Sequence, residues 1–255
     1  MKIVRFKAAG KTRYGVLDGT HIVEYSGTPY GTFKRGRKRW PVKQAVLLAP
    51  VVPTKIVALA LNYYEHAEEM HRAVPDEPWL FLKPLSALCG PDDPIIYPTQ
   101  ATRVDYEGEL AIVIRKRCRH ATPERAREYV LGYTCLNDLT ARDIEQHDHQ
   151  KTRAKAFDTF CPIGPCISTD LDPNAAEVET WVNGELRQVG NTKGFVFPVE
   201  DVVARVSAVM TLLAGDVIAT GTPAGVGPLL PGDRVEVRID GIGSLKNPVI
   251  KLQEA

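Results

Sequence analysis

The sequence predicts an α+β fold in which strands predominate, with a small β domain over residues 1–50 and a larger domain over residues 51–255. Strand-like runs of apolar and β-branched residues outnumber the helical patterns along the chain. These runs cluster towards both ends of the chain, with helical segments between them, which is typical of α+β proteins. No internal repeat is evident, and the change between the two domains falls near residues 45–55.

The charge balance excludes two classes of partner. The 255 residues include 32 Lys and Arg against 31 Asp and Glu, a formal net charge of +1. Such a balance leaves no electrostatic footprint for nucleic acid or an anionic membrane. No apolar run approaches the roughly 18 residues of a membrane span, and the first residues lack the apolar core of a signal peptide. We therefore expect a cytoplasmic protein without nucleic-acid or membrane partners.

Five cysteines are scattered along the chain without a C-x-x-C pair. This pattern argues against a disulfide framework and a zinc site, and it fits a reducing cytosol. Each cysteine lies beside apolar or small residues, which favours buried inert thiols over a catalytic nucleophile. The five are Cys89, Cys118, Cys135, Cys161 and Cys166.

The first fifty residues contain three strand-like runs separated by turn signals. Asp18-Gly19 is a hairpin signal between the second and third of these runs. The stretch 26–40 is rich in Gly, Lys and Arg and is predicted to be a connector. Its basic cluster, 34–39, indicates a solvated loop in preference to a phosphate-binding patch. The three runs are 2–6, 12–17 and 21–25.

A continuous apolar strand at 55–60 precedes a predicted helix at 64–71. His66 and Glu69 lie three apart and therefore share a face of that helix. An imidazole beside a carboxylate is a general-base arrangement, although an ordinary exposed pair has the same spacing. Lys83 closes the next apolar strand, where its ammonium points either into a site or out to solvent.

Two carboxylates stand at the start of the most apolar strand, 104–114. Side chains two apart on a strand leave the same face, so Glu107 and Glu109 are expected to converge. Like charges held together are costly to bury unless a cation lies between them, and a hard divalent ion prefers oxygen ligands. The alternative is a solvated strand end with both carboxylates in water. Asp138 ends another apolar strand, a usual position for a metal ligand or base.

The remaining elements follow from turn and capping signals. Residues 90–98 are predicted to form a loop, and 122–129 a helix with Thr122 as N-cap. His147 and His149 flank Asp148 in a polar stretch that we interpret as mobile surface. Asn183-Gly184 predicts a hairpin. Further predictions are a helix over 198–213, a strand running into the glycine-rich loop 221–227, and closing strands over 233–239 and 243–251.

Six blocks in one order give a more specific signal than any of these motifs alone. The sequence resembles the fumarylacetoacetate hydrolase family, in particular its shorter members that act on acylpyruvates and on homoprotocatechuate-pathway intermediates. The resemblance runs from about Lys55 to the C-terminus. The blocks are 61–70 (LNYYEHAEEM), 81–84 (FLKP), 106–110 (YEGEL), 137–143 (NDLTARD), 154–157 (AKAF) and 220–223 (TGTP).

The resemblance implies a β-rich catalytic domain and a homodimer. It further implies Mg²⁺ or Mn²⁺ held by Glu107, Glu109 and Asp138, with His66 and Glu69 as a lid dyad that activates water. Residues implied at the substrate carboxylate or the developing oxyanion are Lys83, Arg142, Lys155, Thr222 and Tyr63, with Lys155 in a catalytic role.

Two positions depart from the family pattern. The residues before the histidine block, Leu61-Asn62-Tyr63, contain no acid, which implies three carboxylates plus water around the metal. Glu145 stands where the family often has Gln. If Glu145 faces the pocket, its charge would disfavour a second substrate carboxylate nearby.

These residues suit reactions of 2-oxo acids that pass through an enolate, whose charge the metal and nearby cations stabilise. We expect an isomerase or decarboxylase of the 2-hydroxyhepta-2,4-diene-1,7-dioate type in aromatic catabolism. Acylpyruvate hydrolysis and oxaloacetate decarboxylation share the same enolate and stay open. A non-catalytic module that binds a carboxylic acid is a further alternative, whereas an all-carboxylate ligand set disfavours a zinc hydrolase.

Overall fold

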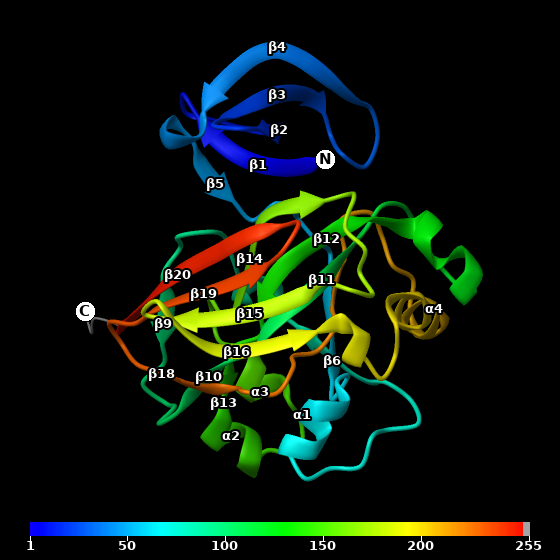
Figure 1. Ribbon diagram of the computed structural model, residues 1–255, viewed down its shortest axis with the longest axis vertical. Helices are drawn as coiled ribbons and strands as arrows, with labels where there is room; N and C mark the ends of the chain where they lie inside the picture. The colour runs from blue at the N-terminus through cyan, green and yellow to red at the C-terminus, as the bar shows by residue number, and fades with distance from the viewer. Residues whose placement is uncertain (252–255) are drawn as a thin grey trace.

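The computed structural model describes residues 1–251, and strands dominate it as the sequence predicts. Twelve strands form one sheet whose main path runs β4-β3-β2-β1-β14-β12-β11-β17-β6-β7. Figure 1 shows the N-terminal strands at one end of the molecule and the short helices α1, α2 and α3 at the other. The β-rich α+β fold class is therefore confirmed.

The N-terminal strands form a meander. Three of them match the predicted runs, and Asp18-Gly19 separates β2 from β3. The predicted connector at 26–40 is wrong, because most of it forms β4, which pairs antiparallel with β3. An edge strand tolerates many Lys and Arg side chains, since those side chains stay in water. The bounds are β1 (Lys2–Ala8), β2 (Lys11–Asp18), β3 (His21–Gly27), β4 (Phe33–Pro41), η1 (Val42–Gln44) and β5 (Val46–Leu48).

Strand β1 connects this meander to the rest of the chain, because it pairs with β14 (Cys161–Ser168) at Lys2 and Ile3. The centre of the sheet is β11, in which every residue is buried. Antiparallel neighbours flank β11 on both sides, and β6 then runs parallel to β17. The remaining strands of this sheet are β6 (Ile56–Ala60), β7 (Trp79–Lys83), β8 (Leu88–Cys89), β11 (Gly108–Ile114), β12 (Val130–Asn137) and β17 (Val217–Ala219).

Two smaller sheets complete the fold. The predicted hairpin around Asn183-Gly184 and both closing strands are confirmed. The loop predicted over 90–98 is wrong at its end, where buried Ile95 begins a short strand that pairs parallel with β20. One sheet is β16 (Glu185–Asn191), β15 (Glu177–Val182), β19 (Arg234–Ile239), β20 (Gly243–Lys251) and β9 (Ile95–Tyr97). The other is β13 (Thr140–Ala141), β10 (Val104–Tyr106) and β18 (Gly227–Leu229).

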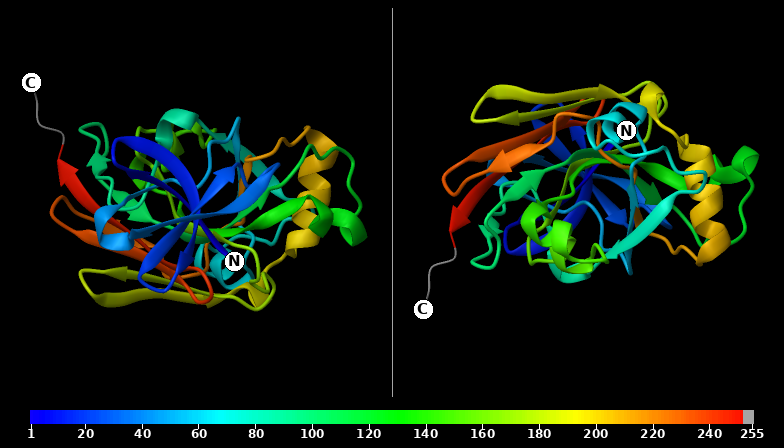
Figure 2. Two further views of the ribbon diagram at one scale, coloured as in Figure 1. Left: turned by 90° about the horizontal axis from the view of Figure 1, so that it is seen from above. Right: turned by 90° about the horizontal axis from the view of Figure 1, so that it is seen from below.

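The helices are short except for α4 (Val199–Val209), which runs along one side of the molecule (Figure 2). It buries Val199, Val202, Val203 and Val206 in the main core. The predicted helix over 198–213 is confirmed but ends earlier, because Leu212 forms a β-bridge with Cys118. The 122–129 segment is a 3₁₀ helix whose Thr122 makes no side-chain cap, and it buries only Ala126. The others are α1 (Tyr64–Glu69), η2 (Leu85–Ala87), η3 (Pro123–Tyr129), α2 (Arg142–His147), α3 (Thr152–Lys155) and η4 (Thr192–Gly194).

Within residues 1–251, none of the helices combines the length and apolarity needed to span a membrane. All five cysteines are free and buried, as the sequence predicts. His147 and His149 are exposed at the end of α2, away from the buried carboxylates described below.

Candidate active site

Three buried carboxylates converge where β11 and β12 pair. Glu107 immediately precedes β11, Glu109 lies within it, and Asp138 follows β12. Antiparallel pairing sets Glu109 opposite Leu136, and the N–H of Asp138 donates to the carbonyl of Glu107 over 2.9 Å. One oxygen from each of the three carboxylates lies within 4.8 Å of the others. The side chains predicted to converge therefore do so, with Asp138 as the third member.

Two lysines neutralise part of this acidic cluster. Nζ of Lys155, at the end of α3, donates to Oε2 of Glu107 over 2.6 Å and to Oδ2 of Asp138 over 2.7 Å. Nζ of Lys83, at the end of β7, contacts Asp138 and donates to the carbonyl of Lys155 over 2.7 Å. Glu109 instead accepts a backbone hydrogen bond from Gly221 over 2.8 Å.

The carboxylates of Glu107 and Glu109 consequently have opposite pKa shifts. Burial alone would raise the pKa of Glu107, but Lys155 and Arg142 outweigh it and hold that pKa below its usual range. Burial raises the pKa of Glu109, and the charges of Asp138 and Glu107 raise it further. Within residues 1–251, Glu109 is therefore the member of the cluster that most lacks a compensating positive charge.

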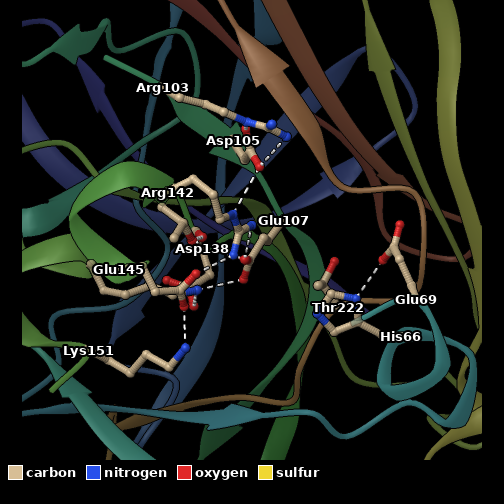
Figure 3. A network of polar contacts seen from close by, with 12 residues as sticks. His66, Glu69, Arg103, Asp105, Glu107, Asp138, Arg142, Glu145, Lys151 and Thr222 are labelled. Carbon is tan, nitrogen blue, oxygen red and sulfur yellow. Dashed lines mark hydrogen bonds and ion pairs between the residues drawn. The ribbon is translucent and has the colours of Figure 1, made fainter. Parts of the chain in front are cut away.

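Arg142 occupies the centre of a second set of ion pairs (Figure 3). Its Nε donates to Asp105 over 2.9 Å, its Nη2 to Glu107 over 2.7 Å, and its Nη1 to Glu145 over 2.6 Å. Burial alone would lower the pKa of Arg142, but these three carboxylates together raise it. The guanidinium is thus fully engaged by the protein, and one of its arms fixes Oε1 of Glu107.

Glu145, which stands where the resemblance implies a frequent glutamine, does face the pocket. Burial would raise its pKa, but Arg142 and Lys155 lower it. Nζ of Lys151 also pairs with Oε1 of Glu145 (Figure 3). The negative charge of Glu145 is therefore compensated by two cations within the site.

The pair on the first helix forms as its spacing predicts. Nδ1 of His66 lies 2.8 Å from Oε2 of Glu69, and His66 is buried. The other oxygen of Glu69 accepts the N–H of Gly225 over 2.9 Å. Glu69 therefore joins α1 to the glycine-rich loop that follows β17, and the carboxylate orients the imidazole.

Thr222 belongs to the same loop, and its hydroxyl both donates and accepts a hydrogen bond. Its Oγ1 donates to the carbonyl of Gly108 over 2.9 Å and accepts from Nε2 of Gln188 over 2.7 Å. Oε1 of Gln188 in turn accepts the N–H of Gly108 over 3.1 Å. Gln188 thus ties the loop to the start of β11.

Several of these groups line one pocket, whose empty volume of about 490 Å³ includes space open to solvent. Two residues predicted at the substrate do not line it. The ring of Tyr63 packs edge-on against Phe195 in the core, with ring centroids 4.7 Å apart, and Lys83 lies behind Asp138 and Lys155. Their contact with substrate stays a prediction. The predicted residues that do line the pocket are His66, Glu107, Arg142, Lys155 and Thr222.

Sequence reasoning missed Asp105, Lys151 and Gln188. Asp105 is fully buried and is held by Arg103 as well as Arg142. An acid inside an apolar run was a usable signal for Asp105, because a buried carboxylate requires a cationic partner. Gln188 gave no such signal, since it lies in a polar strand eighty residues from the glycine that it contacts.

The family profile described as fumarylacetoacetate (FAA) hydrolase C-terminal matches residues 55–250. The chain belongs to the fumarylacetoacetate hydrolase family. A second profile, described as Rv2993c-like N-terminal, matches residues 1–50. The family resemblance predicted from the six sequence blocks is therefore confirmed.

Three relatives illustrate the range of this hydrolase family. Human oxaloacetate tautomerase FAHD2A, mitochondrial, is 40% identical over 223 residues, which cover 82% of this chain and 71% of the human protein. The structure of 2-hydroxyhepta-2,4-diene-1,7-dioate isomerase from Mycobacterium marinum is 41% identical, covers 100% of both chains and has a TM-score of 0.93. That of maleylpyruvate hydrolase from Sphingobium sp. SYK-6, in complex with manganese(II) and pyruvate, is 35% identical, covers 99% of this chain and 100% of that chain, and has a TM-score of 0.82.

Proposed function

We propose that this member of the fumarylacetoacetate hydrolase family is a Mg²⁺- or Mn²⁺-dependent isomerase or decarboxylase of 2-oxo acids and their enol forms. One observation carries the proposal. Glu107 lines the pocket together with Lys155 and His66, and the buried carboxylates of Glu109 and Asp138 each have an oxygen within 4.8 Å of one of Glu107. The full-length similarity to an isomerase and the similarity to a tautomerase support proton transfer as the reaction type.

The donor set fits a hard divalent cation. All three side chains offer carboxylate oxygens, and Glu109 in particular is buried and forms no ion pair within residues 1–251. Such an ion would polarise the 2-oxo group and add a positive charge that the substrate carboxylate can approach. The manganese and pyruvate named for the Sphingobium relative agree with this choice of ion and of substrate class.

Lys155 supplies a fixed positive charge at the site where enolate charge would develop. Its ammonium is buried and already paired with Glu107 and Asp138, so little reorganisation is needed when a substrate oxygen approaches. Its ring contact with Phe81, 5.4 Å from the centroid, further restricts the ammonium. We assign Lys155 to stabilisation of the enolate oxygen.

His66 is the group that moves the proton. Because Nδ1 faces the Glu69 carboxylate, the neutral imidazole carries its proton there and leaves Nε2 as the acceptor. Nε2 would take a proton from the substrate carbon, or from water, and return it at the second position. Arg142 is a positioning residue in this scheme, since its guanidinium fixes Glu107.

Hydrolysis of a C–C bond is the second candidate, and the maleylpyruvate hydrolase relative favours it. In that reaction Nε2 of His66 would take its proton from a water that attacks the carbonyl next to the cleaved bond. The difference between the two reactions lies in whether water reaches His66 during turnover.

A substrate panel tests the proposal. 2-Hydroxyhepta-2,4-diene-1,7-dioate, oxaloacetate, acylpyruvates and fumarylacetoacetate would be assayed with Mg²⁺, with Mn²⁺ and with chelator, following isomer, CO₂ and cleavage products separately. We expect metal-dependent isomerisation or decarboxylation that is lost in Glu109→Gln and kept in Glu177→Gln, an exposed acid on β15. Cleavage products alone would support the hydrolase, and turnover in chelator would overturn the metal-dependent scheme.

A further inference from the structure

The outer end of the active-site pocket has a composition unlike its floor. The floor is formed by buried charged side chains, whereas Met70, Trp79 and Phe81 line its walls. Arg72 also lines the pocket, and it is exposed to solvent as Trp79 is. Since exposed lining residues mark the opening of a pocket, Arg72 and Trp79 lie at its mouth, and the less exposed Met70 and Phe81 lie deeper.

Arg72 differs from the other cations of the pocket in its partners. Arg142 pairs with three carboxylates, Lys155 with two, and Lys151 with Glu145. Arg72 has no carboxylate within ion-pair distance among residues 1–251. Of the cations that line the pocket, it is therefore the one whose charge the described protein leaves uncompensated.

We propose that Arg72 binds the distal carboxylate of a dicarboxylic 2-oxo acid, an inference that rests on the proposed function of this pocket. In this arrangement the 2-oxo acid end of the substrate lies near the buried carboxylates and Lys155. Its apolar or conjugated middle packs between Trp79 and Phe81. Its far carboxylate contacts the guanidinium of Arg72. A planar fork of N–H donors suits a carboxylate and gives a charge-assisted hydrogen bond. Glu145 does not oppose this dianion, because Arg142 and Lys151 compensate its charge.

The position of Arg72 also connects substrate recognition to the proposed base. His71 adopts a left-handed conformation, with φ of 51°, and ends the turn that follows α1. The N–H of Arg72 then donates to the carbonyl of Ala67 over 2.9 Å, which ties it to the last turn of the helix that carries His66. A substrate that binds Arg72 therefore also restrains α1, the helix that holds His66 at the pocket.

The test compares two substrates that differ only at their far end. Wild type, R72Q and R72K would be assayed with a 2,4-dioxo acid ending in a carboxylate and with one of equal length ending in a methyl group. We expect R72Q to lower the ratio of the two kcat/KM values about 10-fold to 100-fold, and R72K to restore part of it. R37Q, which removes an exposed arginine on β4, is the matched control and should leave the ratio at the wild-type value.

A binding measurement separates this inference from the proposed reaction. Calorimetry with 2-oxoadipate and 2-oxohexanoate, in Mg²⁺ and in chelator, reports the far carboxylate without requiring turnover. We expect wild type to prefer 2-oxoadipate and R72Q to lose that preference. If R72Q lost the same affinity for both ligands, Arg72 would only support α1. If it lost no affinity for either, the guanidinium would contact solvent and not the ligand. Either outcome overturns the inference. Selective binding without turnover of either dioxo acid would uphold the Arg72 site and overturn the proposed activity.

Discussion

His66 and Glu69 lie one turn apart on α1, and Nδ1 of the histidine is 2.8 Å from Oε2 of the glutamate. The other oxygen of Glu69 accepts the N–H of Gly225 over 2.9 Å, so one carboxylate both orients the base and fastens its helix. Because orientation of the imidazole depends on this bond, the two residues should act as a unit in turnover.

Replacing His66 by Ala should reduce kcat by about 10²-fold to 10⁴-fold, the usual contribution of a general base. Glu69→Gln should cause a smaller loss, since the amide oxygen can still accept a hydrogen bond from Nδ1 of His66 but carries no charge. Mn²⁺ affinity, measured by calorimetry, should stay at the wild-type value in both variants. His120→Ala, which removes an exposed histidine, is the control for kcat. A wild-type rate in H66A would refute the assignment of the base.

The raised pKa of Glu109 predicts how metal-free stability depends on pH. A carboxylate whose pKa is raised in the folded state contributes stability below the unfolded value of about 4.3, and this contribution is lost as pH rises through the folded pKa. In chelator at pH 8, Glu109→Gln should therefore melt at a higher temperature than wild type, and the gain should shrink towards pH 5.

Addition of Mn²⁺ should reverse the order of the two melting temperatures, so that wild type melts at a higher temperature than Glu109→Gln. Wild type should gain about 2.7 kcal/mol when Mn²⁺ is present at 100 times its Kd, whereas Glu109→Gln should gain little. Differential scanning calorimetry of both proteins with and without Mn²⁺ makes the comparison. If the variant gains as much stability from Mn²⁺ as wild type does, Glu109 is not a ligand.

Arg142 and Arg103 provide a matched pair, because both contact Asp105 but only Arg142 is buried. Arg142→Gln leaves Asp105, Glu107 and Glu145 without their common partner, which should cost about 3–5 kcal/mol of unfolding free energy. Arg103→Gln removes a side chain that is half exposed, so the loss should stay below about 1 kcal/mol. Urea denaturation of the two variants gives both values. Equal losses would show that the buried arginine adds no more stability than the exposed one.

Periodicity in the sequence predicts the parts of the site that depend on local geometry. The convergence of Glu107 and Glu109 follows from the two-residue repeat of a strand, and the contact of His66 with Glu69 follows from helical spacing. Both contacts join residues no more than three apart, so no knowledge of the tertiary fold is needed. Its place at the end of an apolar strand singled out Asp138, and the family resemblance then associated Asp138 and Lys155 with the two glutamates.

Contacts between distant segments could not be predicted in this way. The bond from Gly225 to Glu69 and the bonds of Gln188 depend on how separate strands are placed. Strand β4 was missed for a related reason, since its partner β3 determines its conformation and its own side chains are largely polar. Tyr63 shows the same limit, because its packing against Phe195 depends on a β-bridge between segments 132 residues apart.

Glu145 and Lys151 allow the last prediction. Lys151→Met keeps the side chain near its original length but leaves Glu145 with Arg142 as its remaining ion-pair partner. The pocket then carries one more uncompensated negative charge, which should raise KM for an anionic substrate about 3-fold to 10-fold, the effect of roughly 1 kcal/mol.

Adding Glu145→Gln to Lys151→Met should return KM towards the wild-type value, because the double variant removes the charge that the lysine balanced. Steady-state kinetics of the two single variants and the double variant give the coupling free energy of the pair. Additive effects would show that Lys151 acts on the substrate directly. A positive coupling would instead show that a chain with Glu in place of Gln at this position requires the neighbouring lysine to accept an anion.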